Sequence, residues 1–114
     1  MRVSDSTHDD GGKLMVDLVP AEAILAVAEV LTYGATKYPA NSWRETPDAV
    51  NRYYASALRH LYAWQTGEQQ DKESGLSHLA HATTNLMFML WHSAAKRTYT
   101  WKTYPPGKGN KYVT

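Results

Sequence analysis

The chain has 114 residues, 43% of them hydrophobic, which is enough for one compact domain with a single core. Its formal net charge of +1 gives no general electrostatic reason to bind nucleic acid, and the absence of cysteine excludes disulfides and thiolate zinc sites. No apolar run approaches the roughly 20 residues that span a bilayer, and the polar start is unlike a signal peptide, so we expect a cytoplasmic protein with no membrane and no nucleic-acid partner.

Three segments carry the start and stop signals of α-helices, and no segment predicts a substantial sheet. The predicted helices are 20–33, 47–66 and 74–96. Their short connections predict an all-α fold, an antiparallel helical bundle in which the helices pack in sequence order. Residues 1–97 would form this helical domain, and residues 98–114 an irregular aromatic C-terminal arm.

The helix boundaries are predicted from capping residues. Pro20 suits the first turn of the first helix, and Gly34 suits the left-handed position that ends it. Thr46 is the expected cap of the second helix, and Gly67 is its expected stop. Ser74 can cap the third helix.

The third predicted helix has two chemically different faces. One face carries a polar stripe within about 60° of arc: His78, His81, Asn85 and His92. A face roughly 100° or more away is apolar: Leu79, Leu86 and Leu90. The i, i+3 spacing of two of the histidines would let both imidazoles reach one metal ion. The alternative is a polar seam or a solvated face with no ligand.

The loop before this helix is acidic and contains Glu68, Asp71 and Glu73. Carboxylates that converge with neutral imidazoles suit Mg²⁺ or Mn²⁺. The predicted metal ligands are therefore Asp71, Glu73, His78 and His81. The second helix adds Arg52 and Arg59, whose guanidinium groups could bind phosphate oxygens or could be solvated.

Four stretches together resemble a phage-encoded family of dATP/dGTP diphosphohydrolases, related to the MazG-like all-α nucleotide pyrophosphohydrolases. They are "DDGGKLMVDLVPAEAI", "YGATKYPANSW", "ALRHLYAW" and "GEQQDKESGLSHLAHATTNLMFML". The resemblance covers about Asp9 to Leu90 and implies a helical, oligomeric, Mg²⁺-dependent enzyme. Such an enzyme would cleave a purine nucleoside triphosphate between its α and β phosphates and release pyrophosphate.

The sequence departs from the MazG pattern at the metal site. MazG-like enzymes hold metal with Glu-x-x-Glu and Glu-x-x-Asp pairs, but here His78 and His81 stand where the second acidic pair is expected. The metal site is therefore altered, moved to Asp71 and Glu73, or absent. A chain without the metal could still act as a non-catalytic sponge that sequesters a host signalling nucleotide, and a purely structural helical assembly is a third possibility.

For hydrolysis of a polyphosphate, cationic side chains would bind the phosphates and an uncoordinated group would take a proton from water. The predicted phosphate-binding residues are Lys13, Lys37 and Arg59. The candidate general bases are His60 and Glu68.

A purine base needs aromatic faces and an amide that can read its edge. The predicted base-binding residues are Tyr38, Asn41 and Trp43, and the alternative is that the two aromatic rings only cover the core. Because three helices bury limited apolar surface, we also expect a homo-oligomer.

Overall fold

The computed structural model describes residues 14–94 and 108–109. The chain divides into two units, Pro20–Thr98 and a second one composed of Met1–Val19 and Tyr99–Thr114. In the second unit the described residues form the short 3-10 helix η2 (Val16–Leu18) and a turn at 108–109. The predicted arm at 98–114 lies almost wholly outside the described residues.

The described part of the helical unit contains three α-helices and one short 3-10 helix, which confirms the predicted all-α class. They are α1 (Ala21–Gly34), η3 (Ser42–Glu45), α2 (Ala49–Gln65) and α3 (His78–Ala94). Within the described residues the only β pairing is an isolated bridge between Gln70 and Ser77. No helix of the described part is long and apolar enough to cross a membrane.

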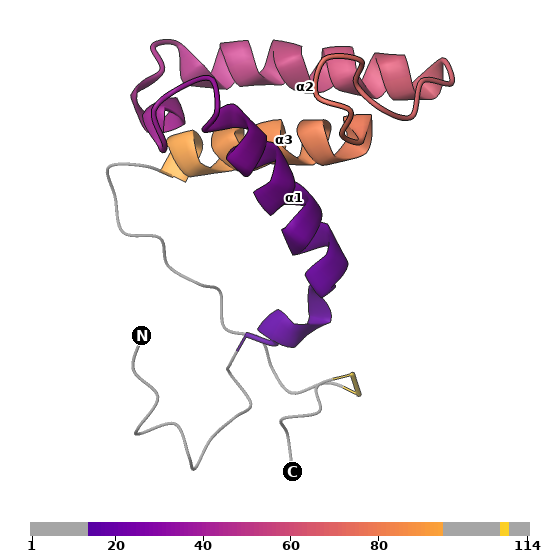
Figure 1. Ribbon diagram of the computed structural model, residues 1–114. Coiled ribbons are helices and arrows are strands. Elements are labelled where there is room, and N and C mark those ends of the chain that lie inside the picture. Colours follow the sequence, from indigo (N-terminus) through magenta and orange to yellow (C-terminus); the bar gives the residue numbers. More distant parts are fainter. Residues whose placement is uncertain (1–13, 95–107, 110–114) are drawn as a thin grey trace. The chain divides into compact units, whose positions relative to one another are not determined.

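Helix α3 is the central element of this unit because it packs against both α1 and α2. Figure 1 shows α2 and α3 side by side and antiparallel, whereas α1 crosses α3 obliquely. The expectation of three helices packed antiparallel in sequence order is therefore met only by α2 and α3.

Three of the expected caps were wrong. Gly34 is the last residue of α1 and does not have a positive φ. Thr46 makes no capping bond, because Asp48 precedes α2 in a left-handed conformation with φ 50°. Ser77, not Ser74, caps α3: its Oγ accepts hydrogen bonds from the two backbone N–H groups at 79 and 80, at 3.1 and 3.3 Å. Gly67 ends the second helix as expected, with φ 107°.

The interior of the described residues is small and unusually polar. Its buried apolar residues are Val30, Ala49, Ala57, Ala80 and Ala82. Its buried polar residues are His78, His81, Thr84 and Asn85. No buried side-chain nitrogen or oxygen in this part of the chain lacks a hydrogen-bond partner, so the polar interior is satisfied rather than strained.

The two faces of α3 have the opposite placement from that of an ordinary amphipathic helix. The polar stripe faces inward, while Leu86 and Leu90 are 49% and 62% exposed. On α1 the large side chains Ile24 and Leu25 are exposed as well. Within the described residues, large apolar side chains of α1 and α3 are therefore exposed.

Candidate functional site

The loop between α2 and α3 is folded by its own polar groups. Asp71 Oδ2 accepts a hydrogen bond from the backbone N–H of Ser74 at 2.8 Å, and the Asp71 carbonyl accepts one from Gly75 at 2.7 Å. Gly75 has φ 74°, a conformation that favours glycine, and this residue reverses the chain before the bridge to Ser77. The loop is therefore a compact turn that holds Asp71 beside the helices.

Three histidines meet between α2 and α3. The Nδ1 atoms of His60 on α2 and His78 on α3 are 2.8 Å apart. The ring of His60 also stacks on that of His81, with 4.4 Å between centroids and 6° between planes. His60 is half-buried, and the other two are buried. The polar stripe of α3 is thus packed against a histidine from the neighbouring helix.

Loop residues hold the two α3 histidines in place. Glu68 Oε1 lies 2.6 Å from His78 Nε2, and because an ionised carboxylate can only accept, His78 carries a proton on Nε2. Ser74 Oγ lies 2.7 Å from His81 Nε2. Each buried imidazole therefore has a fixed orientation.

Burial favours the neutral form of two of these histidines. It lowers the pKa of His60 below its usual value, and the nearby histidines His81 and His78 and the guanidinium of Arg59 lower it further, against an opposing effect of Asp71. Burial also lowers the pKa of His81. These imidazoles are therefore neutral near pH 7, which is the form that binds metal.

The two carboxylates beside them stay ionised. The hydrogen bond to His78 lowers the pKa of Glu68. Burial raises the pKa of Asp71, but hydrogen bonds from Ser74 outweigh that effect, and the pKa is lowered overall. The site therefore combines neutral imidazoles with anionic oxygens near neutral pH.

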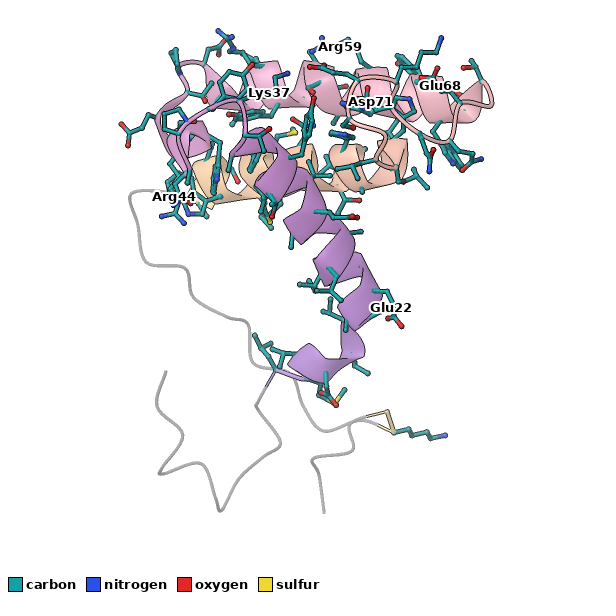
Figure 2. All side chains as sticks on the ribbon, in the orientation of Figure 1. Glu22, Lys37, Arg44, Arg59, Glu68 and Asp71 are labelled. Carbon is teal, nitrogen blue, oxygen red and sulfur yellow. The ribbon has the colours of Figure 1, made fainter. Side chains whose placement is uncertain are left out.

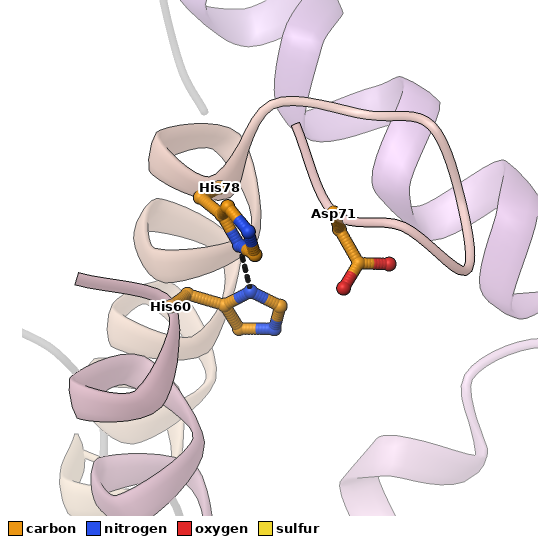
Figure 3. Close-up of side chains that lie close together, drawn as sticks. All are labelled: His60, Asp71 and His78. Atoms are coloured by element: carbon orange, nitrogen blue, oxygen red, sulfur yellow. Dashed lines mark hydrogen bonds between the residues drawn. The ribbon is translucent and has the colours of Figure 1, made fainter. Parts of the chain in front are cut away.

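His60, Asp71 and His78 each bring one potential ligand atom to a common point, with all three atoms within 4.8 Å of one another (Figure 3). This group overlaps only partly with the expected ligands. Asp71 and His78 are in it, while His81 bonds Ser74 instead. His60, expected as a general base, is the third member of this group of potential ligands.

Glu73, the remaining expected ligand, is exposed and forms an ion pair with Lys37. The hydrogen bond from Lys37 lowers the pKa of Glu73, and the same bond raises the pKa of Lys37. The ammonium also lies 5.6 and 5.7 Å from the ring centres of Tyr33 and Tyr38. This pair joins the segment after α1 to the acidic loop and places an expected phosphate-binding lysine beside that loop.

The expected base-binding residues lie in different surroundings. The ring of Trp43 stacks on that of Phe88, with 4.5 Å between centroids. The backbone carbonyl of Trp43 accepts a hydrogen bond from His92 at 2.9 Å. Trp43 therefore covers the core, in line with the alternative reading. Tyr38 is 61% exposed beside Lys37, and Asn41 is exposed with φ 66°.

Of the other expected cationic residues, Arg59 is exposed on α2 next to His60, and Lys13 lies outside the described residues. Figure 2 shows Arg59, Lys37 and Asp71 in the part of the helical unit around α2. Sequence reasoning missed Ser74 as the partner of His81. The Asp-x-x-Ser-Gly spacing, which is typical of a side-chain-capped turn, was the available signal.

Comparison with known proteins adds a family to this geometry. Residues 4–101 match the family described as dATP/dGTP diphosphohydrolase, N-terminal. A curated protein of Salmonella phage PMBT28, described as dATP/dGTP diphosphohydrolase, is 33% identical over 82 residues, which are 72% of this chain and 28% of that protein. The chain thus spans well under half the length of this relative. No solved structure gives a significant match.

Proposed function

The chain belongs to the dATP/dGTP diphosphohydrolase family, and from that premise we propose that it is a phage nucleoside triphosphate pyrophosphohydrolase. Its substrates are deoxypurine nucleoside triphosphates, and the proposal places its action in the host cytoplasm. Water attacks the α-phosphorus, the bond to the bridging oxygen breaks, and the products are a nucleoside monophosphate and pyrophosphate. The reaction depends on a divalent ion, Mg²⁺ or Mn²⁺ in the simplest form of the proposal.

The observation that carries the proposal is the convergence of His60, His78 and Asp71 at the end of the α2–α3 seam. Two imidazoles and an ionised carboxylate within reach of one point form a donor set for a divalent cation. Lys37 pairs with Glu73 of the α2–α3 loop, and Arg59 lies next to His60 on α2, so both can offer positive charge to a polyanionic substrate. A divalent ion bound there would neutralise negative charge on the phosphates and lower the pKa of water.

The other residues have supporting roles in this proposal. Glu68 orients His78 through the bond at Nε2, and Ser74 orients His81. Arg59 and Lys37 bind phosphate oxygens, for which Lys37 must leave Glu73. Tyr38, exposed beside Lys37, is the aromatic surface available to the purine base.

We also propose a homo-oligomer as the functional form. Leu79, Leu86 and Leu90 form an exposed apolar row on α3, with Thr83 between them at the 4-3-4 spacing of a helix–helix seam. The described α3 segment carries no Asp, Glu, Lys or Arg, so two copies can meet there without burying like charges. A second copy is therefore a suitable cover for this row.

The test is a nucleotide screen with two readouts on the untagged chain. Thermal shift measures binding, and chromatography measures release of pyrophosphate and dAMP or dGMP from dATP or dGTP. The proposal expects both, with release abolished in Asp71→Asn and retained in Glu73→Gln. Binding without release would replace it with the sponge function, and neither binding nor release would contradict both. Because the phage relative is much longer, the same assay with that relative tells whether release needs its further residues.

A further inference from the structure

The distance between one ring nitrogen of His60 and one of His78 indicates how the two imidazoles could share a metal ion. His60 Nδ1 and His78 Nδ1 are 2.8 Å apart and come from different helices. Two nitrogens bound to one ion at about 2.0–2.1 Å are about 2.9–3.4 Å apart for bond angles between a right angle and a tetrahedral one. The observed spacing is therefore close to the spacing that adjacent ligands of one ion require.

The hydrogen bonds around His78 determine which of its ring nitrogens could bind a metal ion. His78 Nε2 bonds Glu68 and carries a proton, so its second ring nitrogen, Nδ1, is the atom that faces His60. Either His60 donates a hydrogen bond from its own Nδ1 to His78 Nδ1, or the lone pairs of both Nδ1 atoms turn towards one cation that lies beside the line joining them. A carboxylate behind a metal-bound imidazole is also the arrangement that orients histidine ligands in metalloproteins.

Asp71 supplies the third donor and the negative charge. Its carboxylate is held at the edge of the cluster by the Ser74 N–H, which bonds only Oδ2 at 2.8 Å. Donor atoms on opposite sides of an ion with bonds of about 2.1 Å are about 4.2 Å apart, so the 4.8 Å limit of this group requires only a small side-chain movement. His60 and Asp71 are only half-buried, so the group is not sealed from solvent.

We infer that His60, His78 and Asp71 bind a divalent transition-metal ion of the nitrogen-preferring kind, such as Co²⁺ or Zn²⁺, in preference to Mg²⁺. Two imidazoles and one carboxylate form a softer donor set than the oxygen ligands that Mg²⁺ prefers. The inference deepens the proposed function, because it names the class of ion at the proposed site. Mg²⁺ in the reaction would then be carried by the oxygens of the triphosphate.

The experiment is a titration of the untagged, metal-stripped full chain with Co²⁺ in the absence of nucleotide, followed by visible absorption and isothermal titration calorimetry. We expect one Co²⁺ per chain, visible bands of a nitrogen- and oxygen-ligated ion, and affinity rising from Mg²⁺ through Mn²⁺ to Co²⁺. Absence of Co²⁺ binding, or Mg²⁺ binding as tight as that of Co²⁺, would overturn the inference.

Variants assign the ligands. His60→Ala and Asp71→Asn should each weaken Co²⁺ binding by about tenfold or more and change the absorption bands. Asp71→Asn keeps an acceptor for the Ser74 N–H, so the loop should stay folded. His92→Ala is the matched control, because it removes a histidine of α3 that bonds the Trp43 carbonyl outside the cluster. Equal losses in His92→Ala and His60→Ala at unchanged circular dichroism would contradict the assignment.

Glu68→Gln tests the orienting role of the carboxylate. Its amide oxygen can still accept a hydrogen bond from His78 Nε2 but carries no charge, so we expect a smaller loss of Co²⁺ affinity than in His60→Ala.

The proposed function and the proposed metal preference can fail independently of each other. If the chain hydrolyses dATP or dGTP but does not bind Co²⁺, the proposed function stands and this inference is wrong. If it binds Co²⁺ but does not hydrolyse these nucleotides, this inference stands and the proposed function is wrong.

Discussion

His78 is 4% exposed, and its neighbour on α3, Leu79, is 40% exposed. The histidine faces α2 through His60 and the leucine faces solvent, so the helix has its polar side in the seam and its apolar side outside. An apolar row on the surface of a small domain is a common sign of a protein interface. This relationship leads to the first prediction.

Replacement of Leu86 and Leu90 by lysine should convert the oligomer into a monomer, because each lysine would place a charge in the proposed interface between copies. Mass from light scattering at micromolar concentration measures this. Ala55→Lys, on an exposed position of α2, is the control and should leave the mass unchanged. The interface proposal fails if the unchanged chain is already monomeric, or if the double variant keeps the oligomer mass.

Stability should fall as the pH decreases below about 6.5. The pKa of His60 and of His81 is lowered in the fold, mainly by burial, so the unfolded chain binds protons first as the pH falls. The free energy of unfolding is then highest above the unfolded pKa and decreases through it. Urea unfolding midpoints of chelator-treated protein between about pH 7.5 and pH 5.5 check this. A midpoint that stays constant or rises on acidification would show that the sign is wrong.

A second loss of stability is expected at lower pH, from the carboxylates. Glu68 and Asp71 have lowered pKa values, so their contribution is present above the unfolded values and is lost as the pH falls through the folded ones. Unfolding curves extended below about pH 4.5 should therefore show a further decrease. In Asp71→Asn this second decrease should be smaller.

The two aromatic residues of the expected base site should behave differently. Trp43→Ala removes a ring stacked on Phe88 and should cost about 2–4 kcal/mol of stability. Tyr38→Ala removes an exposed ring and should change the stability little while weakening purine nucleotide binding. Chemical denaturation and calorimetry separate the two effects. Unchanged nucleotide affinity in Tyr38→Ala would remove Tyr38 from the site.

Lys37 and Glu73 should also have opposite effects on nucleotide binding. Glu73→Gln releases the lysine ammonium from its ion pair, so we expect nucleotide affinity to be unchanged or higher. Lys37→Gln removes the proposed phosphate contact and should lower that affinity. The exposed ion pair contributes little to folding, so both variants should melt near the parent temperature. Strong loss of nucleotide binding in Glu73→Gln would return Glu73 to the role of a ligand.

The sequence by itself determined the helices and what each helix carries. Helical periodicity located the three segments, and Gly67 marked the end of the second one. The same periodicity placed His78 and His81 together on one side of the third helix. The loop motif also contained the information that Asp71 precedes a Ser-Gly turn. These features are local, because they depend on residues a few positions apart.

Only the tertiary structure decided which face of α3 is covered and which residues meet there. Periodicity fixes the angle of a side chain on its own helix, but not which other helix packs over it, so the inward polar stripe was not predictable from α3 alone. The same holds for the contacts between His60 and His78 and between Lys37 and Glu73, which join residues 18 and 36 positions apart. The proposed metal site depends on the first of these contacts, because α2 supplies its second imidazole.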